Sequence, residues 1–341
     1  MKLVLNLLFA SLLFCAAPGG LSVQAQTVQP KPKVISEKQA EELLGSVVRV
    51  KARALPDARS NATLGPLREG SGVIIDDRGH ILTIGYLVIE ADAIEVTTAA
   101  GKTSPATLAA YDHATGFGLL HAVLPLGAKP IDLGISAELT LREPVMVAPH
   151  GGRESVNLAY VVSKRQFAGS WEYLLDSAIF VSPPTLPWSG SALISRDGRL
   201  VGIGSLLVRD SEEAGTPLPG NMFVPIDLLK PILADLIDTG RVSGPARPWL
   251  GMSTEELQGR LFVTRVSPEA PADKAGVRRG DIVVGVGADA VATHGELYRK
   301  LWSLGPAGTE VPLKVLQGVS VKEIKVRSID RTEYLRAKPT L

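Results

Sequence analysis

The stretch Pro187-Trp188-Ser189-Gly190-Ser191-Ala192-Leu193 is the most informative part of this sequence. An apolar run precedes it at 178–181, and another follows the turn Arg196-Asp197-Gly198 at 200–204. Short apolar runs bounded by turn residues predict β-strands. The stretch therefore places a serine, followed by glycine, on a loop between two strands, where its hydroxyl is a candidate nucleophile.

Many short strands are predicted on both sides of that loop. Period-two alternation begins at Val47, and apolar runs then alternate with turn clusters as far as residue 224. The runs lie at 73–75, 81–83, 94–97, 106–110, 119–123, 145–148, 159–162, 179–181, 191–194 and 200–203. This spacing predicts an all-β barrel or sandwich pair, with a surface loop over 54–69.

The C-terminal part of the chain has a different pattern. Pro225 opens a predicted helix at 226–238 that ends at Gly240, and the composition of 242–248 is typical of a linker. A compact unit follows over residues 249–332. Its strands are predicted at 263–266, 282–286, 311–316 and 321–326, and its helices at 270–275 and 296–304. The tail 333–341 is polar, and we expect the chain to fray after Arg331.

The N-terminal part predicts export. Lys2, the apolar run 3–14 and the small-x-small site Val23-Gln24-Ala25 are typical of a secretory signal peptide over residues 1–25. The run is too short for a membrane anchor, which must cross about 30 Å of hydrocarbon. Cys15 is the only cysteine, so removal of the signal would exclude disulfides and thiol catalysis. Residues 26–45 are then a leader ending in a short helix at 37–44.

Composition limits the classes of function. The chain has 36 basic and 35 acidic residues, a net charge of +1, and no clustered basic run. Nucleic-acid binding needs such a cluster, so we do not expect it. A His-Glu-x-x-His pattern or a comparable cluster is also missing from the sequence, so we expect no metal and no cofactor.

Several motifs together resemble a known family. Residues 70–76 (Gly-Ser-Gly-Val-Ile-Ile-Asp) with 79–83 resemble the first hairpin of HtrA/Deg-type trypsin-like serine proteases. Residues 189–193 are similar to their nucleophile loop, and residues 220–226 to their last barrel strand and exit helix. Residues 263–272 with 275–283 are similar to their PDZ domain. The resemblance implies a mostly β chain, with a trypsin-like double β-barrel at 46–241 and a C-terminal PDZ domain at 249–332.

The resemblance also implies a damaged catalytic triad. The family's histidine position is occupied here by Tyr86, in the run 81–88, and its aspartate position by Gly116. Ser189 keeps the nucleophile position, although a small hydroxyl residue also suits a tight turn. A phenol titrates near pH 10, so Tyr86 accepts a proton poorly at neutral pH.

The oxyanion hole is incomplete by the same comparison. In this fold the backbone N–H groups of the nucleophile and of the residue two positions before it bind the oxyanion. That second residue is Pro187, which has no N–H. Losing one such donor costs about 10²–10³ in rate.

A different histidine would have to replace Tyr86 for triad chemistry to survive. The candidates are His80, His113, His121, His150 and His294. We expect each to be a surface or loop residue. His113 is the least implausible substitute, because it approaches the strand that bears the acid in the family.

The PDZ-like unit retains its binding motif. By the resemblance, Trp249-Leu250-Gly251-Met252 is the loop whose N–H groups capture a C-terminal carboxylate, and the peptide adds as a strand beside Met252. Leu297 and Leu301 are expected to form the wall of the groove. Gly251 favours this interpretation, because close backbone approach needs a residue without a Cβ. The alternative is that Trp249 and Leu250 only pack the linker onto the barrel.

Three functions remain open on these grounds. The first is a secreted, periplasmic pseudoprotease that binds polypeptides or protein C-termini through its PDZ domain, as a scaffold, chaperone-like holder or sensor. The second is an active serine endopeptidase with a rearranged site, acting in periplasmic protein quality control. The third is a structural subunit of a homotrimer or of a mixed trimer with active relatives, assembled through residues 26–45.

Restoring cleavage should require three substitutions together: Tyr86→His, Gly116→Asp and Pro187→Gly. Each one returns a group that the chemistry needs, so a single change should leave casein uncleaved. Cleavage regained by Tyr86→His alone would contradict this account of the oxyanion hole.

Overall fold

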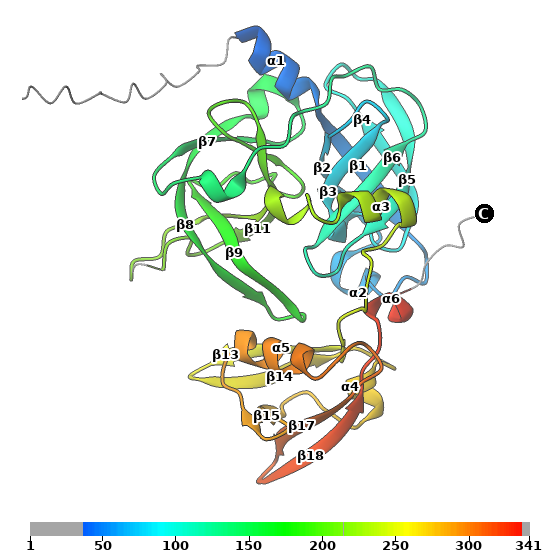
Figure 1. Cartoon of the computed structure of the whole chain (residues 1–341), viewed down its shortest axis with the longest axis vertical. Coiled ribbons are helices and arrows are strands. Elements are labelled where there is room, and N and C mark those ends of the chain that lie inside the picture. Colours follow the sequence, from blue (N-terminus) through cyan, green and yellow to red (C-terminus); the bar gives the residue numbers. More distant parts are fainter. Residues whose placement is uncertain (1–36, 214, 336–341) are drawn as a thin grey trace, which may run out of the picture. The chain divides into compact units, whose positions relative to one another are not determined.

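A computed structural model describes residues 37–213 and 215–335 of the 341-residue chain. The predicted signal peptide and most of the leader therefore lie outside the described residues. Within the described part, no helix is long and apolar enough to cross a bilayer. Figure 1 shows the chain as mostly strands, which confirms the predicted fold class.

The first half of the chain forms a closed antiparallel barrel. Its strands close in the order β1-β2-β3-β6-β5-β4. Their bounds are β1 Val47–Ala54, β2 Leu67–Ile74, β3 His80–Ile84, β4 Ala91–Thr97, β5 Thr103–Tyr111 and β6 Phe117–Ala122. The one-turn helix η1 (Gly85–Leu87) follows β3 and carries Tyr86. The predicted surface loop 54–69 is shorter than expected, because β1 extends to Ala54 and β2 begins at Leu67. The loop also contains a short helix, α2 (Asn61–Leu64).

A second closed barrel follows, in the order β10-β11-β12-β9-β8-β7. Its strands are β7 Pro144–Ala148, β8 Asn157–Gly169, β9 Tyr173–Ser182, β10 Ala192–Ile194, β11 Leu200–Val208 and β12 Gly220–Pro225. The sequence predicted β8 only over 159–162. The observed strand is longer, because β8 pairs with β9 as far as Gly169↔Tyr173 and forms a long hairpin.

The C-terminal unit is an antiparallel sheet in the order β13-β14-β15-β17-β18, with β16 paired to β15. Its strands are β13 Met252–Leu257, β14 Arg260–Val266, β15 Ile282–Val286, β16 Asp289–Ala290, β17 Glu310–Gln317 and β18 Ser320–Arg327. Its helices are α4 Pro271–Lys274 and α5 His294–Ser303. A capping box at Thr293 and Glu296 fixes the start of α5.

The remaining helices correct two predictions. The helix predicted at 226–238 is divided into η4 (Ile226–Leu228) and α3 (Leu233–Thr239), with Pro231 between them. Proline lacks the N–H that a continuous helix needs, which accounts for the interruption. The segment after Arg331 forms a helical turn, α6 (Arg331–Tyr334), whose Tyr334 ring lies 4.8 Å from the Trp249 ring. The helix predicted at 37–44 is confirmed as α1 (Glu37–Gly45), and η2 (Ser136–Glu138) and η3 (Gly152–Ser155) complete the set.

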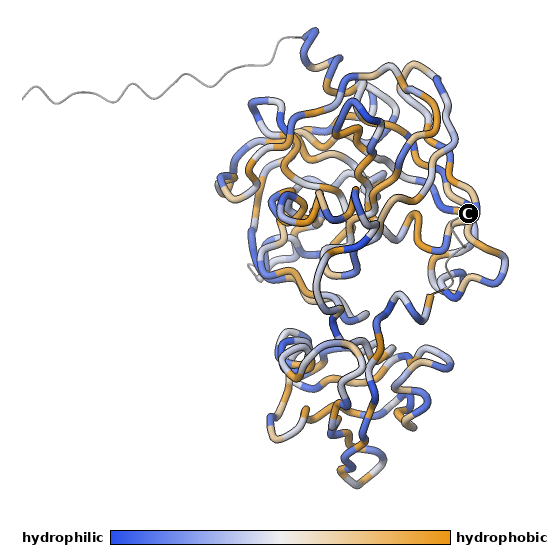
Figure 2. The backbone as a smooth tube through the Cα atoms, turned by 45° about the vertical axis from the view of Figure 1, so that its right-hand side comes forward, coloured by the Kyte–Doolittle hydropathy of each residue, from blue (hydrophilic) through white to orange (hydrophobic). Residues whose placement is uncertain are grey.

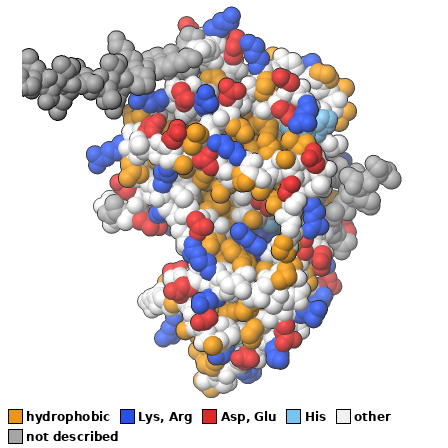
Figure 3. Space-filling view, in the orientation of Figure 1, with side chains coloured by type: hydrophobic (Ala, Val, Ile, Leu, Met, Phe, Trp, Pro, Cys, Tyr) orange, Lys and Arg blue, Asp and Glu red, His pale blue; other side chains and the backbone are white. Residues whose placement is uncertain are grey.

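Burial follows the strand pattern that the sequence predicted. Figure 2 shows hydrophobic and hydrophilic stretches alternating along the chain. Two clusters built largely of Val, Leu, Ile and Ala fill the barrels, and a further cluster fills the C-terminal unit. On the face shown in Figure 3, Lys and Arg are interspersed with Asp and Glu.

A backbone contact connects the serine loop to the first barrel. The N–H of Ser71, on β2, donates to the carbonyl of Ser189 at 2.8 Å. Gly190 adopts a positive φ of +72°, and a Cβ at this position would lie 1.9 Å from the Ser71 carbonyl oxygen. Only glycine fits both the left-handed conformation and this approach.

We predict that Gly190→Ala destabilises the barrels by about 3 kcal/mol, because the added methyl group forces Ser71 and Ser189 apart and the backbone is strained. Thermal unfolding measures the effect. Gly45→Ala is the control, since a Cβ there meets nothing within 4 Å. Equal melting temperatures for the two variants would contradict the prediction.

Candidate functional site

Ser189 lies on the loop between β9 and β10 and is partly exposed to solvent. The loop turns tightly: Ser191 N–H donates to the Trp188 carbonyl at 3.0 Å, and Gly190 N–H donates to the Gly204 carbonyl at 2.8 Å. The hydroxyl is therefore held in a defined turn beside β11. This geometry serves either a nucleophile or a structural turn.

Tyr86 occupies the place next to this hydroxyl. The Tyr86 hydroxyl lies 2.8 Å from Ser189 Oγ and also donates to the carbonyl of Ser205 at 2.8 Å. Burial raises the pKa of Tyr86 to about 12. The phenol therefore keeps its proton at neutral pH, and it cannot act as a general base toward Ser189.

Gly116 offers no carboxylate, and its backbone is unfavourable for a residue that would. Its backbone has a φ of +81°, and a Cβ there would lie 3.2 Å from the Tyr173 hydroxyl oxygen. That hydroxyl donates to the Thr115 carbonyl at 2.5 Å. The three-substitution restoration predicted from the sequence therefore needs a correction: Gly116→Asp would be strained, and Tyr173 would obstruct the new side chain.

The oxyanion-binding side of the loop is also incomplete. Pro187 has no N–H, and the N–H of Trp188 donates to the Leu186 carbonyl at 2.9 Å. Of the two amides that the resemblance assigns to oxyanion binding, only that of Ser189 exists.

In the described part of the chain, no histidine ring is hydrogen-bonded to Ser189. The structure places each candidate elsewhere: His80 Nδ1 lies 2.6 Å from Asp76, His121 Nε2 3.1 Å from the Arg78 carbonyl, and His294 Nε2 3.0 Å from the Thr254 carbonyl. His80 and His294 are largely buried, contrary to the expectation that each histidine is a surface or loop residue.

His150 forms a serine–histidine–acid arrangement that the sequence did not suggest. Its Nδ1 lies 3.1 Å from Ser71 Oγ, and its Nε2 lies 3.7 Å from Glu69. Desolvation lowers the pKa of His150. Ser71 is fully buried, and its Oγ also accepts the backbone N–H of His150 at 2.9 Å. The Ser71 hydroxyl is therefore not accessible to a substrate.

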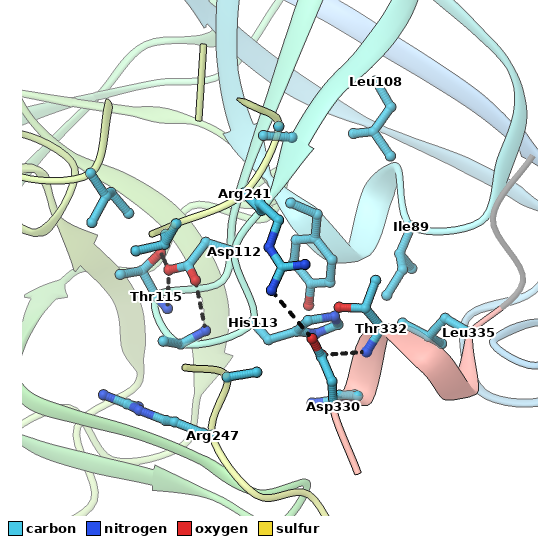
Figure 4. A pocket seen from close by; sticks show the side chains of 18 of the residues that line it. Ile89, Leu108, Asp112, His113, Thr115, Arg241, Arg247, Asp330, Thr332 and Leu335 are labelled. Carbon is cyan, nitrogen blue, oxygen red and sulfur yellow. Dashed lines mark hydrogen bonds and ion pairs between the residues drawn. The ribbon is translucent and has the colours of Figure 1, made fainter. Parts of the chain in front are cut away.

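His113 faces a cavity of about 1110 Å³ that Ser189 and Tyr86 do not line. Figure 4 shows His113 near Asp330, Thr332 and Arg241. Asp330 pairs with Arg241 at 3.9 Å and accepts the Thr332 N–H at 2.9 Å. Burial and the charge of Arg331 lower the pKa of His113 to about 3, so the imidazole is neutral. In this position His113 does not replace Tyr86.

The loop before β13 forms a carboxylate-binding cradle. The N–H groups of Leu250, Gly251 and Met252 donate to the carboxylate of Glu172 at 2.9, 2.7 and 3.2 Å. Gly251 has a φ of +81°, which turns the successive amides toward one point. The amides thus bind a carboxylate of the chain itself, in the position where the resemblance places a peptide terminus.

The apolar residues of the predicted groove lie beside this cradle. Leu250, Met252, Leu297 and Leu301 are buried in one cluster. Trp249 pairs with Ile329 through two backbone hydrogen bonds and is also buried. Leu250 belongs to the core of the C-terminal unit, whereas Trp249 forms an isolated bridge with Ile329 and packs near Tyr334, so the two residues contact more than the barrel.

Glu172 was not among the residues singled out from the sequence. It belongs to the tip of the β8–β9 hairpin, and no short motif marks it. Burial raises the pKa of Glu172 to about 7, against the opposing effects of the three amides and of Arg331. Only the pairing of a barrel hairpin with a distant loop creates this environment.

The fold and site define a class: a trypsin-like peptidase domain followed by a PDZ domain. Comparison with known proteins agrees. Residues 70–203 match the trypsin-like peptidase domain family, and residues 248–327 match the PDZ domain family. Homologues of the chain among named proteins include DegP-like and Do-like proteases.

Relatives with established names are moderately similar. A "Probable periplasmic serine endoprotease DegP-like" from Hahella chejuensis is 28% identical over 73% of this chain and 54% of its own length. Serine protease PepD from Mycobacterium tuberculosis is 29% identical over 87% and 68%. The chain thus spans about half to two-thirds of the length of these relatives.

Solved structures share the fold. A serine endoprotease from Yersinia pestis superimposes with a TM-score of 0.50 and 23% identity, covering 87% of this chain and 98% of that one. The HtrA-type protease AlgW with decapeptide superimposes with a TM-score of 0.53 and 18% identity, covering 89% and 100%.

The raised pKa of Glu172 predicts a pH-dependent stability. The folded state binds this proton more tightly than the unfolded chain, whose carboxyl titrates near pH 4.5. Protonation of Glu172 therefore stabilises the folded state fully below pH 4.5. This stabilisation is lost as the pH rises through about 7, and the free energy of unfolding falls by at most about 3 kcal/mol.

Thermal unfolding at pH 5 and pH 8 checks this prediction. The wild type should lose more stability between these values than Glu172→Gln, which has no proton to release. Parallel pH profiles for the two proteins would contradict it.

Proposed function

We propose that the protein is a secreted, periplasmic HtrA-like pseudoprotease, which binds polypeptides through its PDZ domain and does not hydrolyse them by triad chemistry. The observation that carries this proposal is the Tyr86–Ser189 pair. The hydroxyl that would attack a peptide bond contacts a phenol whose pKa is raised to about 12, where an imidazole would be needed.

Three independent losses support the same conclusion. Tyr86 cannot accept the proton of Ser189, Gly116 cannot orient a base, and Pro187 donates nothing to an oxyanion. Electrostatic stabilisation and proton transfer each contribute orders of magnitude to acyl transfer. Without them, the fold retains a polypeptide-binding unit but lacks the groups that drive cleavage.

The proposed location rests on two supports. The first 25 residues have the pattern of a cleaved signal peptide. Several relatives are named as periplasmic proteins. In that compartment a PDZ domain would meet extended chains and exposed C-termini, which suits a scaffold, a chaperone-like holder or a sensor.

An active serine endopeptidase is the second candidate, and one observation favours it. Ser189 is retained, partly exposed and held in a defined turn. Relatives are named as serine endoproteases. This candidate requires another base to reach Ser189 after a rearrangement.

Assembly is a separate part of the proposal. We propose that residues 26–45 mediate a homotrimer or a mixed trimer with active relatives. Light scattering of the protein alone, and after mixing with an active homologue, tests this directly. A monomeric mass in both samples would contradict it.

We expect a fluorophosphonate probe to leave Ser189 unlabelled and casein to stay intact, because the hydroxyl has no activating base. The labelling of wild type and Ser189→Ala should be the same at background level, beside a trypsin control that reacts. Labelling of the wild type that disappears in Ser189→Ala would exclude the pseudoprotease and favour the endopeptidase.

A further inference from the structure

The tip of the β8–β9 hairpin contacts the loop Leu250–Met252 of the C-terminal unit, beside the predicted peptide groove. Glu172 is buried there, although its backbone has a φ of +59°, a conformation that favours glycine. A charged residue in a left-handed conformation is costly to bury unless its carboxylate is fully bonded. The Glu172 carboxylate must therefore be paired with hydrogen-bond donors in the folded protein.

The Glu172 carboxylate occupies the cradle as a peptide C-terminus would. Three successive amides, from Leu250 to Met252, donate to its two oxygens. A chain-terminal carboxylate presents the same two acceptors and the same charge. The cradle does not distinguish the two sources chemically.

The backbone of the hairpin tip is also hydrogen-bonded to elements of the C-terminal unit. The carbonyl of Ser170 accepts the N–H of Thr254 on β13 at 3.1 Å. The carbonyl of Gly169 accepts the hydroxyl of Tyr298 on α5 at 2.6 Å, and that same hydroxyl lies 3.2 Å from the Glu172 N–H. The hairpin tip thus bonds to both β13 and α5, the two elements between which the resemblance places a bound peptide.

An apolar side chain completes the likeness to a ligand. Leu174, two residues after Glu172, belongs to the buried cluster that contains Leu250, Leu297 and Leu301. At the edge of the contact, Arg299 on α5 pairs with Gln166 and Asp176, one on each strand of the hairpin. Carboxylate, backbone and apolar anchor are therefore all supplied by one segment.

We propose that residues 169–174 are an internal ligand of the PDZ groove, and that an external polypeptide with a free C-terminus binds only by displacing Glu172. The second part rests on the proposed peptide-binding function. The bound state of the groove is then the resting state, and the apparent affinity for an external peptide is reduced by the fraction of molecules in which the hairpin is docked.

Two measurements on the full mature chain test this proposal. The variants are Glu172→Gln, which removes the charge, and Glu172→Gly, which removes the side chain and suits the positive φ. Glu154→Gln is the matched control, since Glu154 is an exposed glutamate on η3 in the same barrel. All four proteins are compared at pH 8.

The first measurement is hydrogen exchange of the Leu250, Gly251 and Met252 amides without any peptide. Exchange should be at least tenfold faster in both Glu172 variants than in the wild type and the control, because a charge-assisted acceptor is lost. Unchanged protection in both variants would overturn the internal ligand.

The second measurement is fluorescence anisotropy with a fluorescein-labelled pool of random octapeptides, one version carrying a free C-terminal carboxylate and the other amidated. The Glu172 variants should bind the free-carboxylate pool about tenfold more tightly than the wild type, with no gain for the amidated pool. Equal affinities in all four proteins would overturn the competition.

The two measurements separate the two ideas. Faster exchange in the Glu172 variants, with no protein binding either pool, would support the internal contact and refute the peptide-binding function.

Discussion

The backbone contact between β2 and the serine loop is the constraint on which the candidate site depends. Ser71 N–H bonds to the Ser189 carbonyl, and Gly190 approaches Ser71 too closely for any side chain. This contact connects the second barrel to the first and keeps Ser189 close to Tyr86 on η1. Tyr86 lies on the first barrel and Ser189 on the loop of the second, so their contact depends on how the two barrels pack.

The residues that replace the catalytic histidine and aspartate are each paired with neighbouring groups. The Tyr86 hydroxyl donates its one proton to the Ser205 carbonyl and can accept the hydrogen of Ser189 Oγ at 2.8 Å, so its hydrogen-bonding capacity is used. Gly116 and Tyr173 fit together in the same way, since the tyrosine fills the space that a carboxylate would need. The site is therefore packed as a stable structure, with its polar groups paired to one another.

The Glu172 contact shows how a binding motif can be satisfied within a chain. Three converging amides in a buried loop must have an acceptor, because unpaired buried N–H groups are costly. The hairpin supplies one at the expense of a strained backbone at Glu172 and a buried carboxyl whose pKa is raised to about 7. The affinity of the loop for an external carboxylate is then set by the free-energy difference between the state that binds Glu172 and the state that binds the external ligand.

Local periodicity in the sequence was enough to predict most of the strands and the two-part architecture. The resemblance to HtrA/Deg-type proteases then assigned residues 86, 116, 187 and 189 to the catalytic positions. It also located the cradle at Leu250–Met252. Only the tertiary structure decided that Tyr173 crowds Gly116, that His150 pairs with Ser71 and that Glu172 fills the cradle. These contacts join residues far apart in the sequence, and no local pattern encodes the packing of one unit against another.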